Sequence, residues 1–409
     1  MRPIKTLITL QVAVLALLLS APANAAAPLP RGAEIKVNTN TVAWHYNPSV
    51  AVFPDGGFVV VFTAGPRWDQ SGRRVIHARL FDSQGRPTSG QFRLIDRVAG
   101  SQFVDHVAAD RDGSFLVVWT ETGSSRRVFV RRFNRDGTPR GEQIQVHRPS
   151  RSSRENGLLA IGPDGRFVVA WESYVRLSEE AGYTSAAARI FTAQGKPATR
   201  EFIVRNGYYG IGDDTIHVYP RAAALGPDGT LSVVVQSYEF GRLQNELIRI
   251  PADGSGGRLI ELNSPFNCCP TSFDGASLAM SPDGSLMAAW GDYQITARRL
   301  TPAGRETEPF VVSEKYTEDQ IDPALARHAG GSFVAVWSEM GRDGDGNGVF
   351  GRAFAADGTP LSRDFRVSTA TAGHQQAPAI SASSKGPVVV VWEQIAPNGR
   401  ADIFARLLR

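Results

Sequence analysis

Cysteine is almost absent from this chain, since Cys268 and Cys269 are its only 2 cysteines in 409 residues. Two cysteines exclude a small fold stapled by several disulfides and a four-cysteine zinc site. Lysine is also scarce, and we attribute the preference for arginine to base composition. The formal net charge is +4, and no basic stripe occurs of the kind that nucleic-acid-binding proteins need. Nucleic acid is therefore not an expected partner.

Familiar catalytic and membrane signals are missing as well. The sequence has no Gly-x-Ser-x-Gly elbow, no phosphate-binding loop and no His-Glu-x-x-His motif. After residue 25 no run is apolar enough to predict a membrane span. Hydrophobic residues make up 42% and charged residues 21% of the chain, which is ordinary for a globular protein.

The N-terminal residues have the pattern of an export signal. Arg2 and Lys5 precede the apolar run from Leu7 to Leu19, and Ala23-Asn24-Ala25 fits a small-x-small cleavage site. We therefore expect 1–25 to be a signal peptide, 26–33 a short linker, and the mature protein to be periplasmic or extracellular. A transmembrane anchor is the alternative, but its apolar core is short for a hydrocarbon layer of ~30 Å.

One repeated unit accounts for the rest of the chain. Each copy has an apolar strand, a tight turn that is usually Asp-Gly, and a Val-rich strand, followed by a third strand and a more polar fourth strand. Asp-Gly suits a hairpin because glycine tolerates the positive φ that the turn requires. The Val-rich runs are typical of strands that are buried on both faces. Their ends form a column in which Val235 replaces an aromatic residue: Phe62, Trp119, Trp171, Val235, Trp290, Trp337 and Trp392.

The last copy ends at Arg409, just after its third strand, and the missing fourth strand has a candidate at the other end of the chain. Residues 34–38 resemble the fourth strands at 201–204 and 364–367. Pairing of the two ends would remove the last open sheet edge. The sequence therefore predicts an all-β fold, a seven-bladed β-propeller over 34–409 in which an N-terminal strand completes the last blade. An open two-sheet array is the alternative, and it leaves 34–38 without a role.

The units resemble the β-propeller repeats of bacterial secreted and surface proteins. The resemblance rests on the pattern Asp-Gly-Gly-Phe-Val-Val-Val-Trp, then Arg-Phe-Asp-x-Asp-Gly-x-Pro, then Phe-Arg-Val, and it covers essentially all of 34–409. It implies a binding or surface scaffold and no particular chemistry, because a fold does not transfer function.

The long, irregular loops are expected on the face opposite the Asp-Gly turns, so function is expected there. Carboxylates that follow the aromatic column are expected at the rim of that face, where they would hold a cation, a sugar or a basic partner, or simply be solvated: Glu121, Glu172, Asp292, Glu339 and Glu393. Two long loops and their flanks predict a ligand site rich in tyrosine, a rigid amphipathic side chain that suits sugar or peptide contacts. Its members are Tyr208, Tyr209, Asp213, Asp214, His217, Arg221 and Asp274. Ordinary loop packing is the alternative.

Two further sites are predicted more narrowly. Asp343, Asp345 and Asn347 alternate like the start of a calcium loop, but the glutamate that would end an EF-hand is absent, so a glycine-rich turn is the simpler interpretation. Cys268 and Cys269 are expected to form a vicinal disulfide, since an exported protein meets an oxidising compartment.

The function that these patterns favour is a monomeric binding or scaffold module without an obligatory cofactor. Its ligand, a carbohydrate, peptide or protein, would bind on the variable-loop face near the channel mouth. A hydrolase or lyase that acts on polysaccharide through channel-mouth carboxylates is the alternative, because two facing carboxyl groups suffice for glycoside cleavage. Whether the protein is an enzyme stays open at this stage, as does a purely structural role.

Overall fold

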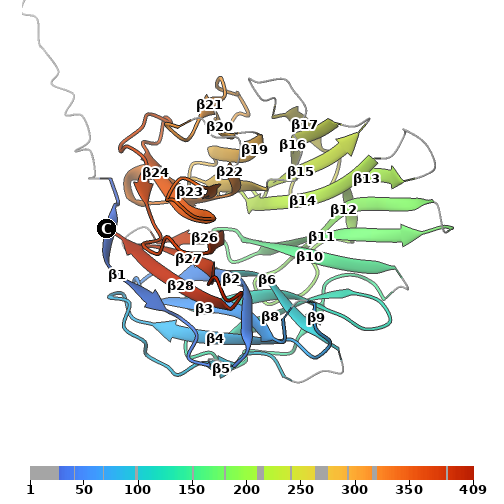
Figure 1. The fold of residues 1–409 in the computed structure, drawn as a ribbon. Helices are drawn as coiled ribbons and strands as arrows, with labels where there is room; N and C mark the ends of the chain where they lie inside the picture. The colour runs from blue at the N-terminus through green and yellow to red at the C-terminus, as the bar shows by residue number, and fades with distance from the viewer. Residues whose placement is uncertain are drawn as a thin grey trace, which may run out of the picture.

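The structure is a computed structural model and describes residues 27–40, 42–67, 69–96, 100–149, 152–178, 181–209, 216–239, 242–262, 275–292, 294–315, 320–383 and 386–409. Its strands form five four-stranded antiparallel sheets and one eight-stranded sheet, arranged as the blades of a β-propeller (Figure 1). The predicted all-β propeller fold is thus confirmed. The eight-stranded sheet contains two successive four-strand units, which are joined where Tyr208 pairs with Ile216.

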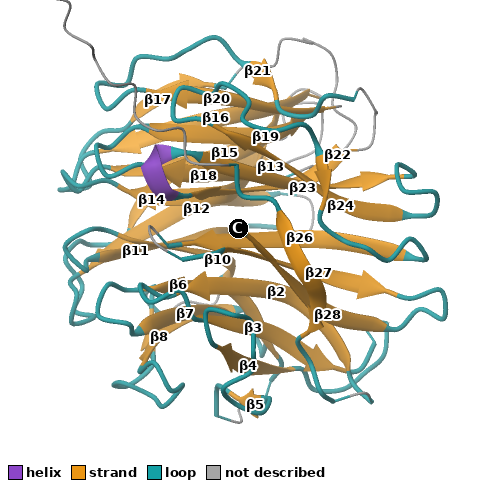
Figure 2. Ribbon diagram, turned by 90° about the vertical axis from the view of Figure 1, so that its left-hand side faces the viewer, coloured by secondary structure: helices purple, strands orange, loops and turns teal. Residues whose placement is uncertain are grey.

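The first strand of each unit is innermost, and each innermost strand contacts the next one along the chain, with the last contacting the first. They are β2 (Trp44–Val52), β6 (Gln102–Ala109), β10 (Ser153–Ile161), β14 (Ile216–Leu225), β18 (Ala276–Met280), β22 (Gln320–Arg327) and β26 (His374–Ala382). The 3-10 turn η1 (Ala329–Gly331), purple in Figure 2, follows β22.

The second strands form the core, as their Val-rich runs predict. They are β3 (Phe58–Gly65), β7 (Phe115–Glu121), β11 (Phe167–Arg176), β15 (Leu231–Glu239), β19 (Leu286–Asp292), β23 (Phe333–Met340) and β27 (Val388–Ile395). All residues of β7 are buried, and the five tryptophans of the aromatic column are among the largest fully buried side chains. The turns before these strands use glycine in the left-handed region, as at Gly56 with φ 87° and Gly284 with φ 84°.

The third and fourth strands lie outside the core strands. The third strands are β4 (Val75–Phe81), β8 (Arg127–Phe133), β12 (Gly182–Phe191), β16 (Arg242–Ile250), β20 (Gln294–Leu300), β24 (Asn347–Phe354) and β28 (Ala401–Leu408). The fourth strands are β5 (Phe92–Arg93), β9 (Ile144–Gln145), β13 (Phe202–Tyr209), β17 (Arg258–Glu261), β21 (Phe310–Val311) and β25 (Phe365–Arg366). The N-terminal strand β1 (Pro30–Lys36) pairs with β28, in the sheet order β1-β28-β27-β26.

The N-terminal strand begins earlier than the sequence predicts. Pro30 and Arg31 already pair with Leu408 and Leu407, and the register shifts between Arg31 and Ile35 before pairing resumes. The residues between, including Gly32 with φ 72°, interrupt the strand pattern. Because this stretch is irregular, strand periodicity in the sequence does not reveal the first two pairs. Part of the expected linker 26–33 is therefore strand.

Arginines of the third strands tie neighbouring units together. The guanidinium of Arg79 donates to the Val37 carbonyl oxygen over 2.9 Å, as Arg189 does to Val146 over 3.3 Å. Arg352 donates to Val312 over 3.0 Å and Arg406 to Val367 over 2.8 Å. An arginine fork reaches two acceptors at once, which a lysine does less well, so arginine at these four positions has a structural reason beyond base composition.

Serines of the innermost strands make a second repeated tie. The hydroxyl oxygens of Ser49 and Ser277 accept hydrogen bonds from the backbone N–H groups of Val107 and Leu325 in the next unit, each over 3.0 Å. Ser381 accepts from the N–H of Val52 in the same way over 3.1 Å. The innermost strands are therefore held in register around the axis.

Candidate functional site at the channel mouth

The innermost strands bulge near their variable-loop ends. The register shifts within β2, β6, β10, β14, β22 and β26. Asn47, Asn156 and Asp322 stand at these bulges with φ of 49°, 56° and 54°, a region that Asn and Asp tolerate better than most residues. Bulges re-aim side chains and are frequent beside functional sites. Here they place polar residues around one end of the central channel.

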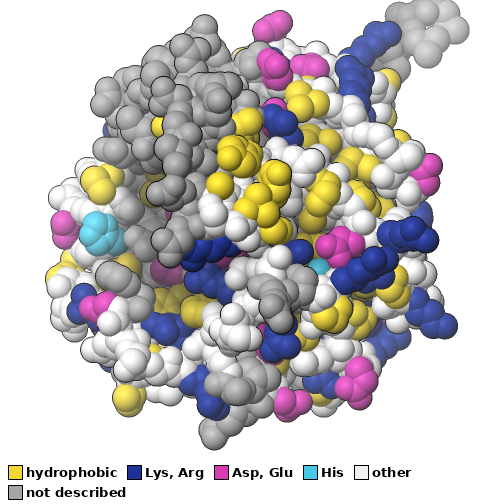
Figure 3. All heavy atoms as spheres, turned by 90° about the vertical axis from the view of Figure 1, so that its right-hand side faces the viewer, with side chains coloured by type: hydrophobic (Ala, Val, Ile, Leu, Met, Phe, Trp, Pro, Cys, Tyr) yellow, Lys and Arg dark blue, Asp and Glu magenta, His cyan; other side chains and the backbone are white. Residues whose placement is uncertain are grey.

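The channel itself is a cavity of about 440 Å³ that all seven innermost strands line. Its walls are mostly small and apolar, and its charged or titratable lining residues are Asp105, His106 and Arg221. Figure 3 shows the side on which the β11–β12 hairpin ends, where basic side chains lie near the centre beside a group of hydrophobic ones. The cavity is of the size that small-molecule sites have.

Asp105 is a carboxyl group held close to neutrality. Its Oδ2 accepts hydrogen bonds from the Thr120 hydroxyl over 2.7 Å and from the Gly157 N–H over 3.0 Å. Burial nevertheless raises the pKa of Asp105 to about 7, and the nearby Glu155 adds to the shift. Burial lowers the pKa of the neighbouring His106 to about 4. At neutral pH the channel wall thus carries a neutral imidazole beside a carboxyl group that is about half protonated.

Glu393 reaches across to the next innermost strand. Its Oε1 accepts a hydrogen bond from the Asn47 N–H over 2.6 Å, and its Oε2 accepts one from the Gln376 side chain over 3.4 Å. Burial raises the pKa of Glu393, and the charge of Asp322 adds to that shift. Two bulge residues therefore lie next to this carboxyl group.

Glu172 and Arg221 lie on the other side of the mouth. Glu172 accepts a hydrogen bond from the Asn156 amide over 2.9 Å, and burial raises the pKa of its carboxyl group. Arg221 donates to the Gln236 side-chain oxygen over 2.8 Å and lies over the Tyr219 ring at 5.1 Å. Glu172 raises the pKa of Tyr219 beyond the effect of burial. A phenol, a guanidinium and a carboxyl group thus share one electrostatic environment.

Two of the five predicted rim carboxylates bind to tryptophans of the aromatic column. Glu121 and Glu339 are buried, and each accepts a hydrogen bond from the indole N–H two residues before it, over 3.1 Å from Trp119 and 2.9 Å from Trp337. Side chains alternate between the two faces of a sheet along a strand. Residues two positions after the aromatic column therefore lie on the same face as the column, whereas Glu172 and Glu393, one position after it, lie on the opposite face. The prediction of a single carboxylate ring is corrected accordingly.

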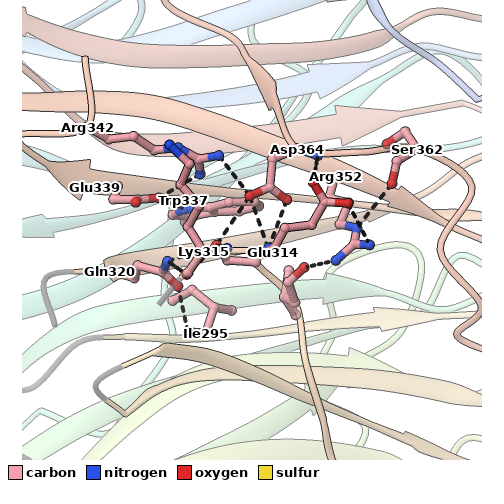
Figure 4. Close-up of polar contacts among 12 residues, drawn as sticks. Ile295, Glu314, Lys315, Gln320, Trp337, Glu339, Arg342, Arg352, Ser362 and Asp364 are labelled. Atoms are coloured by element: carbon pink, nitrogen blue, oxygen red, sulfur yellow. Dashed lines mark hydrogen bonds and ion pairs between the residues drawn. The ribbon is translucent and has the colours of Figure 1, made fainter. Parts of the chain in front are cut away.

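Glu339 belongs to a polar network that joins two neighbouring units, since Asp364 also accepts a hydrogen bond from the Glu314 N–H of the preceding unit over 3.1 Å. Arg342 donates to both Glu339 and Asp364, each over 2.9 Å (Figure 4). If one member of the network moved away, the other charge would stay buried without compensation. The network therefore holds the loop after β23, to which Arg342 belongs, in one position. Asp292, the remaining predicted rim residue, ends β19, and its side chain lies outside the described set.

The predicted tyrosine-rich site does not form one cluster within the described residues. Tyr208 pairs across the sheet with Tyr183, their ring centroids 5.8 Å apart, and it is 38% exposed. Its partner Ile216 lies five residues from Arg221 along β14, which is about 16 Å at the rise of a strand. His217 stacks on Tyr219 at 6.2 Å. Tyr209 is described only as backbone, and Asp213, Asp214, Asp274, Cys268 and Cys269 lie outside the described residues.

The side chains of the predicted calcium loop bind protein groups. Asp343 pairs with Arg366 over 2.9 Å, and Asp345 accepts a hydrogen bond from the Gly373 N–H over 3.1 Å. Asn347 is buried, beside His374. The described ranges contain no group of three or more His, Cys, Asp or Glu side chains that would hold a metal ion. A calcium ion here would have to displace the Arg366 guanidinium, and it stays a prediction.

Sequence reasoning missed Asp105, Asn156 and Asp322. For Asn156 and Asp322 the signal is their place directly before glycine or proline at the start of a unit, as also in Asn47-Pro48, whereas Asp105 precedes His106 and lacks it. Proline lacks an N–H and leaves the ladder at such points, which favours a bulge there.

No protein-family model matches the chain, and no curated protein matches it. Among solved structures, a protein of unknown function from Dyadobacter fermentans is 14% identical, with 92% of this chain and 97% of that chain covered and a TM-score of 0.55. An ulvan lyase of a polysaccharide lyase family is 9% identical over 77% of this chain and 80% of that chain, with a TM-score of 0.49. A Hadza microbial sialidase is 12% identical over 86% of this chain and 76% of that chain, also with a TM-score of 0.49.

These similarities concern the fold and say nothing about chemistry. Within the described residues, no helix has the length and apolar character needed to cross a membrane.

Proposed function

We propose that the chain is a seven-bladed propeller, closed by β1 as the fourth strand of the last blade. The eight-stranded sheet then counts as two blades. Support comes from the ties between units, because Ser381 reaches Val52 as Ser49 reaches Val107, and Arg79 reaches Val37 as Arg189 reaches Val146. The junction between the last and first units thus repeats the chemistry of the internal junctions.

We propose further that this propeller is exported and binds a carbohydrate at the variable-loop mouth of its channel. The observation that carries the proposal is the row of bulges: Asp105 and Arg221 line the cavity, and Asn47 and Asp322 directly precede the lining residues Pro48 and Pro323. Hydroxyl-rich ligands need such mixed donors and acceptors, set in an otherwise apolar pocket. Tyr208, Tyr209, His217 and the loop residues Asp213, Asp214 and Asp274 would form the outer part of the site. A peptide or protein ligand is the competing occupant.

A glycan-binding screen on the mature protein tests this function. Once a glycan is found, Arg221→Met should weaken it at least tenfold, about 1.4 kcal/mol, because the guanidinium lines the cavity. Arg363→Met is the matched control, since Arg363 is exposed, and it should bind like the parent. If no glycan binds, or if both variants bind equally well, the proposed site is wrong.

Polysaccharide cleavage is the second candidate, and Asp105 is the observation that favours it. A carboxyl group with a pKa of about 7 can donate a proton at neutral pH, and Glu172 or Glu393 would act as its partner carboxylate. Asp105→Asn should then abolish the release of reducing ends from a bound polysaccharide while binding persists. Turnover by the parent should fall as the pH rises above about 7. If Asp105→Asn cleaves normally, Asp105 is not the acid.

A further inference from the structure

The end of the channel opposite the mouth contains one charged residue at a position that is otherwise apolar. The last residue of each innermost strand pairs with the first residue of the following strand, as Arg327 does with Phe333. The equivalent residues of the other units are Val52, Ala109, Ile161, Leu225, Met280 and Ala382. Packing alone would favour an apolar residue at 327 as well, so the arginine calls for another reason.

Arg327 borders a second cavity of about 400 Å³ at this end. The turns Gly162-Pro163 and Ser281-Pro282 belong to its lining, which places it at the Asp-Gly end of the channel. It shares Ala109, Leu159 and Ala223 with the cavity behind the mouth, so the two cavities adjoin each other. Most of its remaining wall is apolar, including Ile161, Leu225 and Met280.

The Arg327 guanidinium has no protein partner among the described residues. No hydrogen bond or ion pair from its side chain occurs there, and its Nε is buried without a partner. The acid that acts on it, Asp283, already accepts hydrogen bonds from the Ser285 N–H and hydroxyl over 3.0 and 2.7 Å. Asp110, on the cavity wall, pairs with Arg132 over 2.6 Å. Burial lowers the pKa of Arg327, and the charge of Asp283 offsets only part of that shift.

We propose that this end of the channel is a binding site for a small organic monocarboxylate, whose carboxylate pairs with Arg327 and whose apolar body fills the cavity. A partly buried guanidinium without a counter-ion is costly, and a bidentate carboxylate is its best-matched partner. One partly buried cation matches a single negative charge, because Arg111, the other arginine of the lining, is exposed. The apolar wall favours a hydrocarbon body over a bare oxyanion such as phosphate.

Isothermal titration with hexanoate and benzoate tests the site, with hexanol, benzyl alcohol and inorganic phosphate as comparison ligands. We expect both carboxylates to bind the parent and the alcohols and phosphate to bind at least tenfold more weakly. Arg327→Met should weaken the carboxylates at least tenfold. Its melting temperature without ligand should equal or exceed that of the parent, because methionine occupies the equivalent position 280. Arg363→Met, which alters an exposed arginine, should change neither property.

Several results would overturn the proposal. Equal binding of hexanoate and hexanol would show that charge is not recognised, and tighter binding of phosphate would identify an oxyanion site of another kind. A markedly lower melting temperature of Arg327→Met would indicate a structural role, in which case Arg327→Lys, which keeps the charge, decides. Carboxylate binding that Arg327→Lys does not retain better than Arg327→Met would show that the charge is irrelevant. None of these outcomes bears on the glycan site at the other end.

Discussion

Substitution of Arg79 tests whether β1 completes the last blade and closes the propeller. The Arg79 guanidinium donates to the carbonyl oxygen of Val37, the residue directly after β1, over 2.9 Å and to the Ser89 carbonyl over 3.4 Å, and it lies over the Phe81 ring at 5.5 Å. Arg189 makes the same contacts inside the chain, to Val146 over 3.3 Å and Thr199 over 3.2 Å, with Phe191 at 5.7 Å. The two arginines are therefore a matched pair, one at the junction of the termini and one at an internal junction.

Replacing either arginine by methionine keeps the packing of the aliphatic stem and removes the charged donor. A hydrogen bond to a charged group contributes about 1.5–3 kcal/mol, and an arginine over an aromatic ring adds about 0.5–1 kcal/mol. We expect Arg79→Met and Arg189→Met each to lower the free energy of unfolding by about 3 kcal/mol, as measured by urea denaturation. If Arg79→Met costs less than about 0.5 kcal/mol, the scatter of ordinary surface substitutions, while Arg189→Met costs the full amount, β1 is not the fourth strand of the last blade.

Three further expectations concern a channel carboxyl, a buried network and the cysteines. The pKa of Asp105 in the folded protein, about 7, lies above the ordinary value of ~4. The contribution of Asp105 to stability is therefore complete below pH ~4 and is lost as the pH rises through 7. Asp105→Asn should flatten this fall in the free energy of unfolding between pH 5 and 8, as measured by urea titrations. Glu339→Ala should cost about 3 kcal/mol in the same assay and leave glycan affinity unchanged, because Glu339 is fully buried beside Arg342; a stable variant with lost affinity would contradict this. Mass spectrometry should find Cys268 and Cys269 bonded to each other, two hydrogens lighter than the dithiol, and complete alkylation without reduction would exclude the bond.

The strand plan could be predicted from the sequence because it depends on local signals. Val-rich runs, Asp-Gly turns and the aromatic column recur in most units, and each signal acts within a few residues. The N-terminal strand was predictable for the same reason, since Glu34 to Val37 has the pattern of a fourth strand. Its first pairs, at Pro30 and Arg31, were not predictable, because an irregular stretch separates them from that pattern.

The candidate site was less predictable because it depends on how strands end. Treating the carboxylates after the column as one ring ignored the alternation that separates Glu121 and Glu339 from Glu172 and Glu393. Grouping Tyr208 with Arg221 followed from nearness in sequence, whereas β13 and β14 extend beyond the core and place the two far apart. Asp105 and Asp322 act through bulges, which strand periodicity does not reveal.

The pairing between β13 and β14 also bears on how neighbouring blades can separate. Tyr208 and Ile216 pair directly, so backbone pairing runs without a break from β10 to β17, whereas the remaining neighbouring sheets are separate. A thermal fluctuation that parts two blades at this joint must break main-chain pairing as well as side-chain packing, and it should therefore be rarer there than at the other junctions. Circular permutation that places new termini between residues 209 and 216 should weaken this pairing, because it removes the chain connection between β13 and β14. New termini between β5 and β6 would leave the pairing in place.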